Sequence, residues 1–128
     1  KEKSGTIFHV GSIASNESSG SISYNVSKSA LSSYVRTLSK SLAKYNICVT
    51  GICPGGFEYK DNAMNRLKKR NMAAYNNFIN KRIPLKRMPN AKELMPIIKM
   101  AISKNNLMLT GNMISCDASE GSFYKSFS

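Results

Sequence analysis

The chain has 128 residues, 41% of them hydrophobic, and its 19 lysines and arginines against 7 acidic residues give a net charge of +12. This length fits one domain, and the apolar content is sufficient for a core. No apolar run approaches the roughly 18 residues of a membrane span, which argues against a transmembrane helix and favours a soluble protein.

The first half of the chain contains two apolar runs separated by one long periodic segment. Residues 6–10 are rich in β-forming side chains, and residues 47–53 form a second apolar run that stops at Pro54-Gly55-Gly56. Between them, residues 24–45 predict an amphipathic helix of about six turns, which Asn46 closes. A strand, a helix and a second strand are typical of a βαβ unit with parallel strands and a right-handed crossover. The apolar positions of the predicted helix are Val26, Ala30, Leu31, Tyr34, Val35, Leu38 and Leu42.

The second half of the chain is polar and basic before a final strand. Asn90 and Glu93 have the spacing of a capping box, which predicts a helix running to about Ser103, with a kink or a late start at Pro96. Residues 112–116 form a third apolar run, so the order of elements defines an α/β fold. Helical pieces with weak boundaries are also expected before residue 86, from the spacing of Met64, Leu67, Asn71, Ala74, Tyr75, Phe78 and Ile79.

The cysteines and the single histidine indicate little about metal or disulfide chemistry. Cys48, Cys53 and Cys116 lie in apolar runs without a CxxC motif, so we expect buried, reduced thiols in a cytoplasmic protein. His9 has no cluster of cysteines or carboxylates beside it, and a metal site is therefore not expected.

Tyr24 and Lys28 are the residues most suggestive of chemistry. Four positions apart on a helix, they share one face, and an ammonium group near a phenol favours the phenolate. An isolated match of this kind would be read as an exposed polar pair. Here, Ser12 and Pro54-Gly55 follow the two parallel strands, at the sheet edge where ligands bind. A hydroxyl from Ser12 and the phenol of Tyr24 are therefore expected to converge on one oxygen atom of an alcohol or carbonyl, with which Tyr24 can exchange a proton.

The order of these motifs closely resembles the C-terminal half of the short-chain dehydrogenase/reductase family. Ser12 is followed by Tyr24-Asn25-Val26-Ser27-Lys28-Ser29-Ala30-Leu31, by a strand ending in Pro54-Gly55, and by Thr110-Gly111 before a strand that ends at Asp117. The resemblance covers about residues 4–124. It implies a partial doubly wound, Rossmann-like parallel sheet with flanking helices. Residues 1–128 would then form a single partial domain, from which the N-terminal nucleotide-binding half is absent.

The resemblance implies three catalytic roles. Tyr24 would be the acid/base, Ser12 would polarise the substrate carbonyl, and Lys28 would promote deprotonation of the tyrosine and bind the nicotinamide ribose. Ser15 is an alternative for the serine, because the spacing from Ser12 to Tyr24 is one residue shorter than is usual in the family. The expected reaction is hydride transfer between a nicotinamide cofactor and a small carbonyl or alcohol substrate.

The resemblance also implies a cofactor site and an assembly. The cofactor would be NAD or NADP, which this sequence does not distinguish because it contains no GxxxGxG motif. Full-length members of the family form dimers or tetramers, so a homo-oligomer is expected. The residues implied to contact the cofactor are Tyr24, Lys28, Pro54, Gly55 and Phe57.

Two alternative functions compete with an enzyme. Residues 60–104 hold 12 basic and 2 acidic residues (12 − 2 = +10), so they are suited to RNA, another anion or a phosphorylated substrate. No nucleic-acid motif accompanies this charge, and solvated helix faces explain it more simply. A half-sheet also exposes strand edges, which is compatible with a non-catalytic remnant or an assembly partner.

Overall fold

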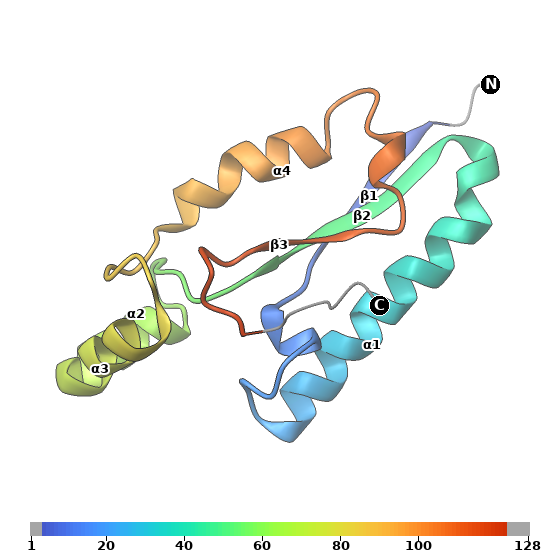
Figure 1. Cartoon of the computed structure of the whole chain (residues 1–128). Coiled ribbons are helices and arrows are strands. Elements are labelled where there is room, and N and C mark those ends of the chain that lie inside the picture. Colours follow the sequence, from blue (N-terminus) through green and yellow to red (C-terminus); the bar gives the residue numbers. More distant parts are fainter. Residues whose placement is uncertain (1–3, 123–128) are drawn as a thin grey trace.

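The computed structural model describes residues 4–122, which form a parallel sheet with helices packed on it (Figure 1). The strands are β1 (Gly5–Val10), β2 (Ile47–Pro54) and β3 (Met113–Cys116), in the order β1-β2-β3. Gly5 pairs with Ile47, and Gly51 pairs with Met113. The central strand β2 is buried along nearly its whole length, as expected for a strand covered on both faces.

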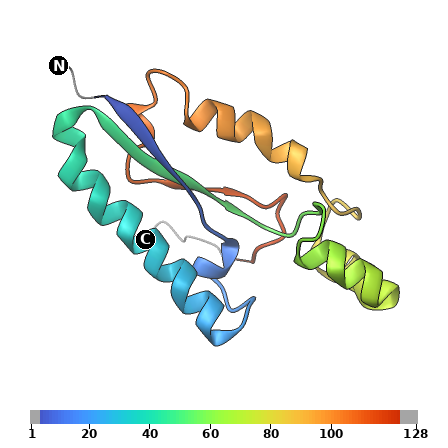
Figure 2. The same cartoon turned by 180° about the vertical axis from the view of Figure 1, so that it is seen from behind.

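Helices α1 (Ile22–Leu42) and α4 (Met95–Ala101) lie on opposite faces of the sheet in both views (Figures 1 and 2). The three parallel strands follow one another in a single direction across the sheet. The crossover from β1 through α1 to β2 and the crossover from β2 through α4 to β3 therefore have opposite hands. One of the two departs from the usual right-handed crossover. The predicted α/β class with a parallel, Rossmann-like sheet and flanking helices is confirmed.

Helix α1 begins two residues before the predicted start, because the Ser21 hydroxyl accepts a hydrogen bond from the Tyr24 amide at 3.3 Å. It ends at Leu42, and one 3-10 turn (Ala43–Tyr45) leads to Asn46, whose left-handed φ of 56° closes the helix. The predicted apolar face is only partly correct. Val35 is completely buried against the sheet, whereas Val26 and Tyr34 are 63% and 54% exposed.

Helices α2 (Ala63–Arg70) and α3 (Met72–Arg82) form an arm beyond the carboxyl ends of the strands (Figure 1). The prediction of Asn71 as a helical position is wrong, because its extended backbone separates the two helices. Its side chain accepts from the Ala74 amide at 2.9 Å and caps α3. The arm has a small core of its own, formed by Tyr75, Ile79 and Ile83 with Met64, Leu67, Phe78 and Met88 around it.

The capping box at Asn90 and Glu93 is confirmed, but it begins a 3-10 turn (Ala91–Leu94) rather than an α-helix. α4 starts only at Met95, with Pro96 in its first turn, so the predicted late start is also confirmed. The helix stops at Ala101, short of the predicted Ser103. Within residues 4–122, no helix is both long enough and apolar enough to cross a membrane.

All three cysteines are free thiols. Cys48 and Cys53 are buried in β2, as predicted, whereas Cys116 at the end of β3 is only partly buried. Burial raises the pKa of Cys48, and it raises that of Cys116 to about 11 with help from the neighbouring Cys53 and Asp117. Cys48 and Cys116 are therefore held in the neutral, less reactive thiol form.

Candidate active site

Ser12 lies two residues beyond β1 and caps a short 3-10 turn (Ile13–Ser15). Its hydroxyl oxygen accepts a hydrogen bond from the Ala14 amide at 3.1 Å. The hydroxyl hydrogen remains available to donate to another group. The alternative residue, Ser15, donates its hydroxyl to the Ser12 carbonyl oxygen at 2.8 Å. Ser15 is thus used to hold the turn, whereas Ser12 faces a groove described below.

Tyr24 lies in the first turn of α1, with 44% of its surface exposed, and Lys28 follows one turn later. The Lys28 ammonium group is 5.7 Å from the centre of the Tyr24 ring. It also donates to the carbonyl oxygen of Val10, the last residue of β1, at 3.1 Å. An ammonium group has three donors, so further donors are left for a ligand.

The loop between Ser12 and Tyr24 is fastened to the start of α1. The Asn25 side chain accepts from the Gly20 amide at 2.9 Å and donates to the carbonyl oxygen of Glu17. One turn later, the Ser29 hydroxyl donates to the carbonyl oxygen of Ser15 at 2.9 Å. These bonds hold the loop between Ser12 and Tyr24 against α1, so that both segments reach one edge of the sheet.

Ser12 and Tyr24 line the same groove, which has a volume of about 660 Å³. Of the other predicted cofactor contacts, Gly55 and Phe57 also line it, whereas Lys28 and Pro54, which is buried at the end of β2, do not. Ser19, Asn62, Arg82 and Glu120 add polar groups to the two hydroxyls, and the remaining side chains of the lining are apolar. Its apolar lining includes Ile13, Phe57, Ala63, Met64 and Phe78.

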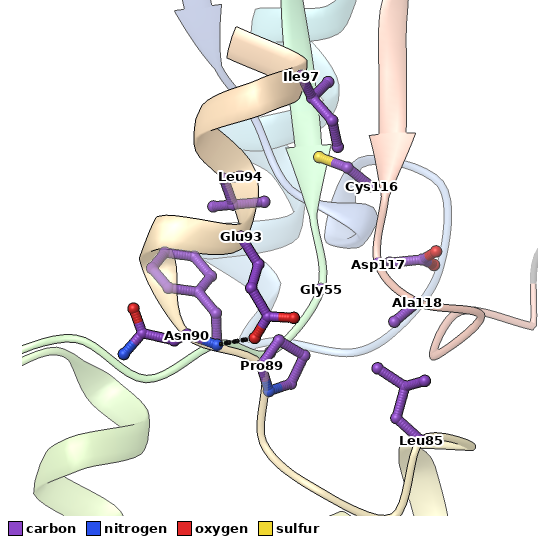
Figure 3. Close-up of a pocket in the computed structure, with 12 residues that line it drawn as sticks. Gly55, Leu85, Pro89, Asn90, Glu93, Leu94, Ile97, Cys116, Asp117 and Ala118 are labelled. Atoms are coloured by element: carbon purple, nitrogen blue, oxygen red, sulfur yellow. Dashed lines mark hydrogen bonds between the residues drawn. The ribbon is translucent and has the colours of Figure 1, made fainter.

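A second, smaller hollow of about 230 Å³ lies between the start of α4 and the ends of β2 and β3 (Figure 3). Gly55, Gly56 and Phe57 line both hollows, so the turn after β2 separates them. At its rim, Glu93 accepts from the Asn90 amide at 2.9 Å. The Arg87 guanidinium, together with that amide, lowers the pKa of Glu93 to about 2.

A charged cluster that the sequence did not predict lies at the groove, and two of its members, Arg82 and Glu120, line it. The Arg82 guanidinium lies 2.7 Å from a Glu17 carboxylate oxygen and 3.5 Å from one of Glu120. Burial alone would raise the pKa of Glu17, but the Ser122 amide and Arg82 lower it overall. Burial raises the pKa of Glu120, and nearby Glu17 and Asp117 add to this despite opposing bonds from Gly56 and Arg82.

The residues present fit only one end of a nicotinamide cofactor. Tyr24 and Lys28 offer a phenol and an ammonium group at the strand ends, and Gly55 and Phe57 form a wall of the same groove. The sequence has no glycine-rich turn of the kind that holds a pyrophosphate on a helix N-terminus. In the described part of the chain, no three His, Cys, Asp or Glu side chains are grouped to hold a metal ion.

This fold and site define a Rossmann-like α/β protein with hydroxyl and ammonium groups at the carboxyl ends of its strands. The family model described as enoyl-(acyl carrier protein) reductase matches residues 1–118. The chain therefore belongs to the short-chain dehydrogenase/reductase family. No curated protein sequence matches it.

Solved structures agree with this assignment. L-sorbose reductase from Gluconobacter frateurii, complexed with NADPH and L-sorbose, is 25% identical, with a TM-score of 0.81 over 95% of this chain and 49% of that chain. A short chain dehydrogenase family protein from Francisella tularensis is 25% identical, with a TM-score of 0.79 over 91% and 51%. The Pseudomonas aeruginosa RhlG/NADP complex is 26% identical, with a TM-score of 0.74 over 88% and 45%. The chain spans about half the length of these structures.

Proposed function

We propose that residues 1–128 are the C-terminal catalytic half of an NAD(P)-dependent oxidoreductase that interconverts a carbonyl and an alcohol. The observation that carries this proposal is the shared groove of Ser12 and Tyr24, with the Lys28 ammonium 5.7 Å from the tyrosine ring. The similarity to L-sorbose reductase complexed with NADPH and to the RhlG/NADP complex supports the choice of cofactor. A homo-oligomer in the cytoplasm is part of the same proposal.

The chemistry follows from the residues in the groove. When bound beside Gly55 and Phe57, NAD(P)H would supply a hydride to the substrate carbonyl carbon. The Tyr24 hydroxyl gives a proton to the carbonyl oxygen, and the reverse reaction returns it. The free hydroxyl hydrogen of Ser12 stabilises negative charge on that oxygen. Lys28 holds positive charge near the phenol and offers donors to the ribose.

The proposal is tested by mixing the chain with a complementary N-terminal half from a family member and following NAD(P)H oxidation with a panel of carbonyl compounds. We expect Tyr24→Phe to lower turnover by about 10²–10⁴-fold, because the acid/base is removed. Tyr34→Phe is the matched control, since Tyr34 lies on the same helix and is 54% exposed. A folded complex without turnover, or equal turnover of Tyr24→Phe and the parent, would end the enzyme proposal.

A non-catalytic assembly partner is the second candidate, and exposed apolar side chains favour it. Ile22 and Val26 on α1 are 87% and 63% exposed, and Val10 on the outer strand β1 is 52% exposed. An outer strand beside an apolar helix face favours pairing with another chain. We expect the chain alone to self-associate in analytical ultracentrifugation, and the complementary half to suppress this. A monodisperse, cooperatively unfolding monomer would contradict that expectation.

A further inference from the structure

The α2–α3 arm, residues 63–82, is attached to the rest of the molecule through few contacts. Its helices pack mainly on each other, and the small core that Tyr75 and Ile79 form with Ile83, the residue after α3, lies apart from the sheet. Figure 1 shows the arm beyond the ends of the strands, away from both α1 and α4. Met64 and Phe78 nevertheless line the groove of Ser12 and Tyr24. The shape of the groove therefore depends on how the arm is held.

One contact between the arm and the sheet is the close approach of Phe78 to the turn after β2. A Cβ atom on Gly56 would lie 3.1 Å from the Phe78 ring and 3.2 Å from a Glu120 carboxylate oxygen. The absence of a side chain at Gly56 thus lets the ring and the carboxylate reach the same turn. Tyr75 and Lys68 also bond to Glu58, at 2.7 Å and 3.2 Å, but neither of these contacts reaches the segments after β1 and β3.

Arg82, the last residue of α3, supplies a directional contact. Its guanidinium is 2.7 Å from Glu17, in the loop that leads to Tyr24, and 3.5 Å from Glu120, which follows β3. The Glu17 and Glu120 side chains are only 11% and 5% exposed. Glu120 also accepts from the Gly56 amide, and Glu17 accepts from the Ser122 amide at 3.0 Å. One guanidinium therefore joins the arm to two segments at the strand ends.

The cluster is sensitive to the loss of its only cation. Glu17, Glu120 and nearby Asp117 carry three carboxylates, and Arg82 is the basic group that Glu17 and Glu120 share. The Arg82 side chain is 37% exposed, but removing it leaves the buried Glu17 and Glu120 carboxylates without their shared cation, which is unfavourable. Arg82 also lies at the C-terminus of α3, where a positive charge interacts favourably with the helix dipole.

We propose that Arg82 is a positioning residue: held by Glu17 and Glu120, it fixes the α2–α3 arm so that Met64 and Phe78 form a constant wall of the Ser12–Tyr24 groove. The inference rests on the proposed function only in treating this groove as the substrate site. Without the contact, the arm keeps the bonds of Tyr75 and Lys68 to Glu58 but loses its link to the segments that carry Glu17 and Glu120, and it can shift relative to the strand ends. The substrate contacts then loosen while Ser12, Tyr24 and Lys28 keep their places.

The test is hydrogen–deuterium exchange of the full chain. We expect Arg82→Ala to raise exchange in residues 63–82 by on the order of tenfold or more, while β2 remains protected. Arg82→Lys keeps the charge and should restore most of the protection. Arg87→Ala is the matched control. Arg87 forms an exposed ion pair with Glu93, with 2.7 Å between nitrogen and oxygen, and this pair does not line the groove of Ser12 and Tyr24. If Arg82→Ala does not fold, Glu17→Gln provides the same comparison.

The outcomes separate this inference from the proposed function. Unchanged exchange in the arm of Arg82→Ala, or an equal rise across the arm and β2, overturns the positioning role. In the mixed, complete enzyme, Arg82→Ala should raise KM more than it lowers kcat, whereas Tyr24→Phe should lower kcat without altering exchange. A loss of kcat at unchanged KM would contradict the positioning role. If the parent shows no turnover, the exchange result still decides whether Arg82 holds the arm.

Discussion

The Lys28 ammonium donates a hydrogen bond to the Val10 carbonyl oxygen at 3.1 Å, which ties the helix carrying Tyr24 to the strand that precedes Ser12. A side chain on the second turn of α1 thus connects the two segments that supply the hydroxyl groups. The same ammonium lies 5.7 Å from the Tyr24 ring, so one cation has both a structural and an electrostatic role.

Lys28→Ala should impair a completed enzyme at every pH tested, because it removes the positive charge that lies 5.7 Å from the centre of the Tyr24 ring. Activity at neutral pH should fall by about 10²-fold or more. The measurement is a pH–rate profile of the chain mixed with its complementary half. Lys40→Ala is the control, since Lys40 lies in the last turn of the same helix. An unchanged profile would remove Lys28 from this role.

Glu120→Gln should make the folded chain less sensitive to pH. Burial, Glu17 and Asp117 raise the pKa of Glu120 in the folded state above its ordinary 4.5. The folded chain therefore binds this proton at pH values where the unfolded chain has released it, and stability from this group is lost as pH rises through the folded pKa. Glutamine keeps an oxygen that accepts from the Gly56 amide without the buried charge.

Urea denaturation of Glu120→Gln and the parent, near pH 4.5 and at neutral pH, measures this difference. Glu120→Gln should be as stable as the parent or more stable at neutral pH. The difference in stability between the two should become smaller as the pH falls. Glu17→Gln should behave in the opposite way, because its folded pKa is lowered and its charge is favoured at neutral pH. Equal loss of stability in both variants at neutral pH would contradict the opposite shifts.

Tyr75→Phe should destabilise the arm by about 1.5–3 kcal/mol, because it removes a hydrogen bond to a charged group. The Tyr75 hydroxyl donates to Glu58 at 2.7 Å. Burial, followed by the bond to Glu58 and its charge, raises the pKa of Tyr75 from 10.0 to about 12. Stability from this tyrosine is therefore fully present below pH 10.0 and lost as pH rises toward about 12. Urea denaturation below and above pH 10.0 checks both expectations. Tyr59→Phe is the control, because Tyr59 is 62% exposed.

Gly51→Ala should disrupt the centre of the sheet. A Cβ atom there would lie 2.3 Å from the His9 carbonyl oxygen and 2.8 Å from the Met113 sulfur. Because β2 is packed between two strands, this overpacking should cost about 1–3 kcal/mol in thermal unfolding. Gly5→Ala is the control, since nothing lies within 4 Å of a Cβ at that position. Similar melting temperatures for the two variants would show that the strands can separate to accept the methyl group.

The sheet could be predicted from the sequence because its determinants are local. Continuous apolar runs ending at Gly11 and Pro54 are typical of buried parallel strands, and β1 and β2 match them within one residue. Pro96 fixes the late start of α4 in the same local way. The burial of the α1 face that contains Val26 and Tyr34 is harder to predict. Periodicity places apolar side chains on one face of a helix but does not show what covers that face.

The charged cluster could not be predicted because its members meet only in the folded chain. Glu17 and Arg82 are 65 positions apart, and neither belongs to a motif. The sequence shows the excess of basic residues, but it does not show which acidic residues form ion pairs with them. Lys68 pairs with Glu58 at 3.2 Å and Lys69 with Asp61 at 3.0 Å, so part of the charge on α2 is matched locally.

Asn71 is the single residue between α2 and α3, and it serves both helices. Its amide donates to the Leu67 carbonyl oxygen at 2.8 Å, and its side chain accepts from Ala74 at 2.9 Å. An alanine at position 71 would favour a continuous helix, because alanine lacks the capping oxygen and has the highest helix propensity. The two short helices would then merge into one straight rod roughly 30 Å long. The bend that brings Arg82 back to Glu17 thus depends on one side-chain amide.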